Sequence, residues 1–251
     1  KRTTHTSWYN ETLNTATRGS RREFPAVAVL VLSANKLTIY DGDDPDLPMW
    51  MEAYQFVGGG GGGTTTNWHG GSGTFSSVAA LNGIIICGAS GGCRNLHFVN
   101  DRMSLFYTPS SGNYTQSGGI SNRNDAYSSW GASDSYYAQL INASTNDVAM
   151  TVLPNAPIDD TTRLPVPTIA VGTDGGVSVI KDDGTVVDIT ITTGANNDGD
   201  RVDFTDDNRV VIQWGGDSAG EITIDEIPSA DTSANYPINL PGSHYNDNSP
   251  G

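Results

Sequence analysis

Short runs of β-branched and other apolar residues, separated by turn-forming residues, recur along the whole chain. Such runs are typical of strands, whereas apolar positions at helical spacing are almost absent. The pattern therefore predicts an all-β fold. The strongest strand predictions cover residues 26–33, 36–40, 83–87, 103–107, 147–153, 168–172, 176–181, 185–192, 210–214 and 221–227.

The residues between these runs favour hairpins. Asp-Gly-Gly at residues 174–176 and Asp-Asp-Gly at residues 182–184 supply the positive-φ positions that tight hairpins require. No amphipathic stretch of helical length separates the strands, so parallel β-α-β units are not expected. We predict antiparallel sheets.

The strand pattern also repeats. A strand with an apolar start, a turn, a more apolar strand and an alternating third strand follow one another from Val78, from Val148 and from Val202, and residues 26–40 fit the later part of the same plan. Four degenerate units of three or four strands predict a β-propeller-like array, with long loops between some strands. A β-sandwich or jelly roll is the alternative.

Polar, glycine-rich and proline-rich stretches suggest the domain limits. We expect residues 1–22 to form an extended N-terminal linker, residues 23–227 the repetitive β-domain, and residues 228–251 a polar linker that leaves the domain. Six consecutive glycines at residues 58–63 indicate a loop. The basic cluster at residues 18–22 is interpreted as a solvated linker or as a contact for an acidic surface.

Charge narrows the function classes. The chain of 251 residues has a formal net charge of −15, and residues 155–251 carry 17 acidic side chains against 4 basic ones. Sequence-independent binding to nucleic acid depends on basic side chains, so it is not expected. No apolar segment approaches the length that spans a bilayer, so membrane insertion is not expected either.

Three sets of residues are candidates for special chemistry. Cys87 and Cys93 flank a glycine-rich loop and form either a cross-hairpin disulfide or two buried thiols. Asp198, Asp200 and Asp203 are weak candidates for a calcium site, because Ca²⁺ takes several oxygen ligands, but Asx-rich turns explain the same residues; apart from calcium, no cofactor is expected. The aromatic residues in loop-like sequence are candidates for carbohydrate contact, with core packing as the alternative: Trp68, Tyr114, Tyr127, Trp130, Tyr136 and Tyr137.

Motifs for catalysis are weak. Residues 88–92 read G-x-S-x-G, but a strand-like run follows them where a nucleophile elbow needs a helix, so a hairpin turn is the better interpretation. The four histidines, His97 among them, lie in unrelated contexts and are interpreted as ordinary surface or half-buried residues. A glycosidase would need two converging carboxylates, for example from Asp134, Asp174 or Asp203.

Four segments together resemble large structural proteins of marine tailed phages, of the tail-fibre or tailspike type: residues 17–28, 37–50, 146–158 and 164–188. The matched residues make up about a third of the chain and spread over most of its length. The resemblance implies an extracellular virion component involved in host attachment, which contacts other tail proteins and a host surface glycan or receptor. It also implies a homotrimer, and it provides no catalytic residues to transfer.

From these observations we expect a non-enzymatic attachment scaffold. A polysaccharide-degrading tailspike enzyme and a lectin-type carbohydrate-binding module are the alternatives. An enzyme would gather two carboxylates in a cleft, whereas a scaffold would scatter its acids over turns.

Overall fold

The computed structural model describes residues 3–33, 36–54, 74–108, 114–116, 118–124, 130–132, 139–160, 162–191, 197–215 and 221–234. Within them the chain forms strands and two short 3-10 helices, η1 (Trp8–Asn10) and η2 (Ile120–Asn122). The prediction of an all-β protein is confirmed.

Four sheets follow one another in chain order. The first sheet contains β1 (Ala28–Ser33), β2 (Lys36–Asp41) and β3 (Met49–Tyr54). The second contains β4 (Phe75–Leu81), β5 (Ile84–Ala89), β6 (Cys93–His97), β7 (Arg102–Phe106), β8 (Tyr114–Gln116) and β9 (Trp130–Ala132). The third contains β10 (Thr145–Thr151), β11 (Thr168–Thr173), β12 (Gly176–Ile180), β13 (Val186–Ile191) and β17 (Thr232–Ala234). The fourth contains β14 (Gly199–Phe204), β15 (Val210–Trp214) and β16 (Glu221–Asp225).

Neighbouring strands pair antiparallel within each sheet, except that β17 pairs parallel to β13. Each of the ten strand predictions corresponds to an observed strand. Between β4 and β5, Asn82 and Gly83 both adopt positive φ (52° and 79°), as a two-residue hairpin turn with the right twist requires. The hairpins after β11 and β12 contain the glycines at positive φ that the sequence predicts, Gly176 and Gly184.

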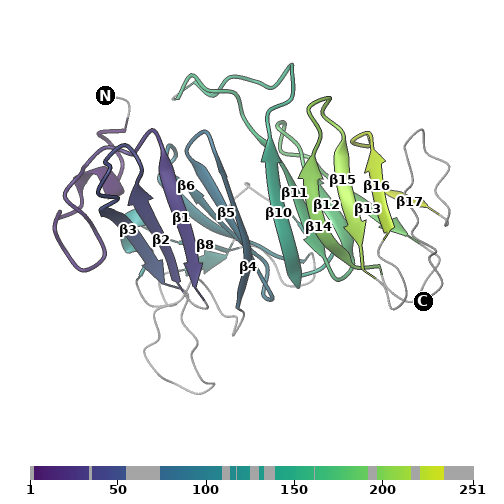
Figure 1. The fold of residues 1–251 in the computed structure, drawn as a ribbon, viewed down its shortest axis with the longest axis horizontal. Coiled ribbons are helices and arrows are strands. Elements are labelled where there is room, and N and C mark those ends of the chain that lie inside the picture. The colour runs from purple at the N-terminus through teal and green to yellow at the C-terminus, as the bar shows by residue number, and fades with distance from the viewer. Residues whose placement is uncertain are drawn as a thin grey trace.

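The sheets form a row along the long axis of the molecule, with β1–β3 at one end and β14–β16 near the other (Figure 1). Their first strands lie next to one another, because β4 contacts β1 and β10, and β10 contacts β14. The repeats predicted from Val78, Val148 and Val202 are therefore the first three strands of the second, third and fourth sheets. The N-terminal hairpin differs from its prediction, because β1 occupies the position of a first strand.

Each interface between sheets has its own hydrophobic core. Trp50, Leu96 and other side chains fill the space between the first and second sheets, Ile86 and Val171 belong to the cluster between the second and third, and Trp214 belongs to the cluster between the third and fourth. Because the two middle sheets are covered on both sides, every residue of β5, β11 and β12 is buried. Such strands read as continuous apolar runs.

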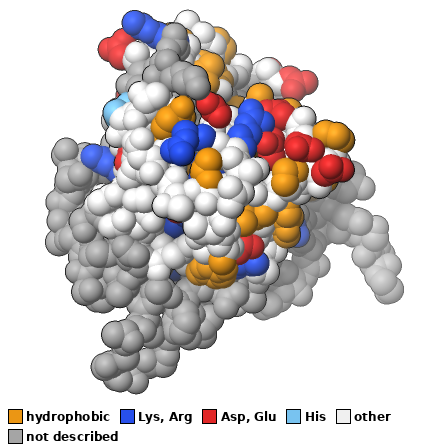
Figure 2. Space-filling model, turned by 90° about the vertical axis from the view of Figure 1, so that its left-hand side faces the viewer, with side chains coloured by type: hydrophobic (Ala, Val, Ile, Leu, Met, Phe, Trp, Pro, Cys, Tyr) orange, Lys and Arg blue, Asp and Glu red, His pale blue; other side chains and the backbone are white. Residues whose placement is uncertain are grey.

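The first sheet has one uncovered face. Exposed and half-buried residues alternate along β1, and Val29 and Val31 are 40% and 46% exposed. Figure 2 views the molecule from this end, where hydrophobic side chains lie among charged ones. In the same sheet, Lys36 of β2 and Glu52 of β3 form an ion pair with a distance of 2.6 Å between Nζ and Oε1.

The N-terminal segment is not the extended linker that the sequence suggested. Trp8 is fully buried, and its indole Nε1 donates a hydrogen bond of 2.7 Å to the Phe98 carbonyl. Arg18 is also fully buried: its guanidinium stacks 4.4 Å from the Trp50 ring centroid and donates to the Trp50 carbonyl at 2.8 Å. Burial lowers the pKa of Arg18 to about 10, which leaves it charged near neutral pH.

The rest of the basic cluster and the C-terminal segment also differ from the prediction. Arg21 forms ion pairs with Asp41 (2.7 Å) and Asp43 (2.8 Å), so it is bound within the same domain rather than solvated on a linker. Beyond residue 227 the chain continues into the third sheet as β17. The domain therefore includes the segment before residue 22 and extends at least to Ala234.

Candidate functional site

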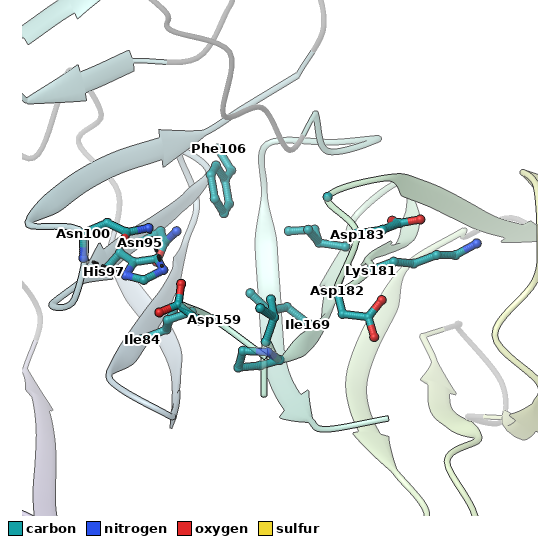
Figure 3. Close-up of a pocket in the computed structure, with 14 residues that line it drawn as sticks. Ile84, Asn95, His97, Asn100, Phe106, Asp159, Ile169, Lys181, Asp182 and Asp183 are labelled. Carbon is teal, nitrogen blue, oxygen red and sulfur yellow. Dashed lines mark hydrogen bonds between the residues drawn. The ribbon is translucent and has the colours of Figure 1, made fainter. Parts of the chain in front are cut away.

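A cavity of about 380 Å³ lies between the second and third sheets (Figure 3). This volume falls within the range of ligand pockets, which starts at about 300 Å³. One wall comes from β5, β6 and β7, and the other from β11 and the β12–β13 hairpin. The loop between β10 and β11 lies between the two walls in the close-up.

The first wall carries polar side chains on buried strands. Asn95 and His97 are two residues apart on β6, so both point to the face that meets the third sheet. Ser104 of β7 lies directly opposite Asn95 in the register and shares this face. Asn95 is 3% exposed and Ser104 is 2% exposed, and neither Asn95 Oδ1 nor Ser104 Oγ has a hydrogen-bond partner.

His97 is held in the wall as a neutral side chain. The Asn100 backbone N–H donates to His97 Nδ1 at 3.3 Å, which leaves the ring proton on Nε2. Burial lowers the pKa of His97 to about 4, although the nearby Asp159 carboxylate acts in the opposite direction. The ring is therefore uncharged near neutral pH, and this part of the wall contributes polarity without charge.

The second wall ends in the charged turn between β12 and β13. Gly184 N–H donates to the Lys181 carbonyl at 2.9 Å, and Lys181 N–H donates to the Thr185 carbonyl at 2.8 Å, so Lys181, Asp182 and Asp183 are presented by a closed turn. The Thr185 hydroxyl and backbone N–H both donate to Asp183, and these hydrogen bonds lower the pKa of the Asp183 carboxyl.

Asp159 reaches the cavity from the β10–β11 loop. An isolated bridge between Ile158 and Pro165 closes this loop, and the Asn82 amide donates to the Pro165 carbonyl at 2.7 Å, which fixes the loop to the β4–β5 turn. The Asp159 carboxylate accepts hydrogen bonds from the backbone and hydroxyl of Thr162. In Figure 3, Asp159 lies on the same side of the cavity as Ile84, below His97.

Between the polar groups the lining is apolar, with Ile84, Phe106, Ile169 and Ile180 contributed by strands of both walls. This combination of apolar surface with a few convergent polar groups is typical of binding pockets. No group of three or more His, Cys, Asp and Glu side chains in the described part of the chain could hold a metal ion. The arrangement therefore offers hydrogen bonds, charge and apolar contact for binding.

The residues proposed for carbohydrate contact cannot be placed at this cavity. Tyr114 and Trp130 belong to β8 and β9, but their side chains are outside the description. The other four candidates, Trp68, Tyr127, Tyr136 and Tyr137, lie outside the described residues. Their proposed role stays a prediction.

The calcium candidates lie at the fourth sheet. Asp198 is close enough to both Asp174 and Asp200 for the carboxylates to repel one another, and burial together with these two neighbours raises the pKa of Asp198. Asp203 lies further along β14 and accepts a hydrogen bond from its neighbour Phe204. The three predicted ligands do not meet as a group that could hold a metal ion in the described chain.

The two cysteines are free and buried in the structure. Cys87 of β5 pairs with Arg94 across the hairpin, so Cys93, the residue before Arg94, points to the opposite face of the sheet. The cross-hairpin disulfide does not form because the two thiols face different neighbouring sheets. Of the disulfide and the two buried thiols that the sequence left open, the structure contains the two buried thiols.

The carboxylates considered for a glycosidase are not gathered at the cavity. Asp174 precedes β12, Asp203 is on β14 in another sheet, and Asp134 lies outside the described residues. Residues 88–92 continue β5 into a hairpin turn before β6, as predicted, and do not lead into a helix. The cavity residues Asn95, Asp159 and Lys181 were not singled out by the sequence, because the two sheets that bring them together are distant in the chain.

Comparison with known proteins finds similar structures but no related family. No family model and no curated protein matches the sequence. A crystal structure of a protein of unknown function from Bacteroides caccae is similar, with 12% identity and a TM-score of 0.38, over 82% of this chain and 59% of that one. The extracellular domain of the putative one component system BT4673 from B. thetaiotaomicron has 13% identity and a TM-score of 0.32, over 80% of this chain and 27% of that one.

The chain thus spans less than two thirds of the length of either similar structure. Among the described residues, none of the helices has the length and apolar character that crossing a membrane requires.

Proposed function

We propose that this protein is a non-enzymatic β-scaffold that serves in host attachment, as an extracellular component of a virion of the tail-fibre or tailspike type. The observation that carries the scaffold role is the continuous packing of four sheets, each interface with its own core. A row of sheets joined in this way holds its loops in fixed relative positions, and binding functions commonly reside on loops carried by a rigid frame. The assignment to a virion rests on the resemblance of four sequence segments, residues 17–28, 37–50, 146–158 and 164–188, to structural proteins of marine tailed phages.

We further propose that the sheets are propeller-like blades. Three features support this: the sheets follow chain order, they pack face to face, and their first strands are adjacent. Blades of a propeller share these features. A β-sandwich has two sheets, so it accounts less well for four.

A lectin-type activity is the second candidate, and the cavity between the second and third sheets favours it. Its mixture of apolar lining and hydrogen-bonding groups suits a small polar ligand. Of the carboxylates named for the glycosidase alternative, Asp174 and Asp203 lie in separate sheets. Three other carboxylates, of Asp159, Asp182 and Asp183, line the cavity, so an assay for released sugar separates binding from hydrolysis. Other tail proteins and a second and third copy of the chain are the proposed partners.

The attachment role can be tested with the purified full chain. The fluorescently labelled protein is applied to marine bacterial cells and to a glycan array, and the supernatants are assayed for new reducing ends. Saturable binding without release of reducing sugar is the expected result. A steady rise in reducing ends would identify an enzyme, and failure to bind any cell or glycan would argue against attachment. Light scattering tests the homotrimer.

A further inference from the structure

One buried polar atom in the wall of the inter-sheet cavity lacks a partner. Asn95 lines the cavity, is 3% exposed, and its Oδ1 accepts no hydrogen bond. Ser104, directly opposite on β7, also has an unpartnered Oγ on this face of the sheet, but it lies outside the lining of the cavity. Buried polar groups in folded proteins nearly always have partners, so an exception calls for an explanation. A carbonyl oxygen accepts hydrogen bonds only, so the missing partner of Asn95 is a donor.

The charges around the cavity specify the ligand further. Asp159, Asp182 and Asp183 line it with one basic residue, Lys181. His97, which is buried and neutral, adds no positive charge. The lining therefore has a formal excess of two negative charges, which attracts a cationic ligand and repels an anionic one.

Apolar side chains define the shape that fits between these polar groups. Phe106 and Ile84 lie on one wall, and Ile169 and Ile180 belong to β11 and β12 of the other. The labelled polar side chains come from both sides of the cavity (Figure 3). A flat, compact molecule can contact the apolar walls with its C–H groups while its edge donates hydrogen bonds. A saturated sugar ring has this combination, and a volume of 380 Å³ accommodates one ring together with water.

We propose that the cavity between the second and third sheets binds a hydroxylated amine of sugar size, a hexosamine with a free ammonium group. One of its hydroxyl groups donates to Asn95 Oδ1, and its ammonium group faces the acidic rim formed by Asp159, Asp182 and Asp183. This inference deepens the lectin-type candidate, on which it rests, by naming the class of ligand. It concerns this cavity alone and holds whether or not the scaffold belongs to a virion.

The test measures binding of three small sugars to the full chain by calorimetry and ligand-observed NMR at low salt. D-glucosamine, D-glucose and D-glucuronate share a ring and differ in charge. We expect saturable binding of glucosamine, at least threefold weaker binding of glucose, and no saturable binding of glucuronate. Equal binding of all three sugars, or no binding of glucosamine at millimolar concentration, would overturn the proposal.

Two variants separate a ligand contact from a structural role. Asn95→Leu removes the unpartnered acceptor at similar volume, so we expect at least a tenfold loss of glucosamine binding with the melting temperature retained. Asp182→Asn removes one rim charge, and we expect about a threefold loss. Asp206→Asn, in an exposed turn after β14, is the matched control and leaves binding unchanged.

The outcomes of these variants are decisive in both directions. Glucosamine binding that survives Asn95→Leu would place the sugar elsewhere and refute the site. A large fall in melting temperature of Asn95→Leu would show that the amide serves the fold, and Asp182→Asn, which changes a turn at the rim, then decides whether glucosamine binds here. Because no cells are used, failure of the attachment experiment leaves this result unaffected.

Discussion

The Ser77 hydroxyl of β4 donates a hydrogen bond of 2.6 Å to the Asp147 carboxylate of β10. The second oxygen of the same carboxylate accepts from the Val202 backbone N–H of β14 at 3.1 Å. One side chain therefore connects the first strands of three successive sheets. Its contacts run between sheets, where the hydrogen-bond ladders of the strands do not reach.

Replacing Asp147 should weaken the packing between the second, third and fourth sheets. We expect Asp147→Ala to lower the free energy of unfolding by about 1–3 kcal/mol, because the Ser77 hydroxyl and the Val202 N–H both lose their acceptor. The measurement is urea unfolding followed by circular dichroism. Asp203→Asn, an exposed carboxylate on β14, is the control, and we expect it to change stability by less than about 0.5 kcal/mol. Equal effects of the two variants would contradict the connection.

The N-terminal segment should be essential to stability. Trp8→Ala removes a fully buried indole and its hydrogen bond to the Phe98 carbonyl, so we expect a loss of about 3–5 kcal/mol. His5→Ala changes an exposed residue of the same segment and is the control. Thermal unfolding of both variants checks this. If Trp8→Ala melts like the unsubstituted protein, the segment behaves as a linker after all.

The two cysteines should be unreactive until the protein unfolds. Burial raises the pKa of Cys93 to about 12 and that of Cys87 further, so neither thiol ionises near neutral pH, and the thiolate is the reactive form. We expect no reaction of the native protein with Ellman's reagent and two reactive thiols in guanidinium chloride. If the freshly purified protein shows no reactive thiol even in guanidinium chloride, Cys87 and Cys93 form a disulfide, and the register of β5 and β6 is contradicted.

Acidification should destabilise the protein through His97. The pKa of its imidazole is about 4 in the folded state, against the ordinary histidine value of 6.5, so between these values the unfolded chain binds the proton more strongly. The contribution of neutral His97 is intact above pH 6.5 and declines as the pH falls towards 4, by about 2 kcal/mol between pH 7.5 and pH 5.

Comparison with a His97→Gln variant isolates this effect from the carboxylates, which titrate in both proteins. We expect the variant to lose less stability than the unsubstituted protein between pH 7.5 and pH 5 in urea unfolding. Parallel pH profiles would show that His97 is protonated in the folded state over this range.

The strands were predictable where alternation and turn residues coincide. The hairpin between β11 and β12 is an example, because its apolar runs meet at a glycine with positive φ. The short strands β8, β9 and β17, of three residues each, are too brief for periodicity to show. β3 was missed because its sequence, MWMEAY, lacks a clear alternation and a register shift interrupts its pairing with β2.

The burial of the N-terminal segment could not be read from its composition. Arg18 looks like a linker residue, and only the Trp50 ring and carbonyl beside it explain how a guanidinium is buried. The cavity could not be predicted from the sequence either, since residues from β6 and from the turn after β12 meet only when the two sheets pack. One local signal existed: Asn95 and His97 place two polar side chains on one face of a strand whose neighbour β5 is fully buried.

The parallel pairing of β17 with β13 has a mechanical consequence. After completing the fourth sheet, the chain returns to the third, where Ile189 pairs with Thr232 and Ile191 with Ala234. Tension applied to the chain beyond Ala234 is therefore transmitted to the third sheet first, and the fourth sheet is shielded from it. A pull from that end must break the β13–β17 bonds before it can unravel β16.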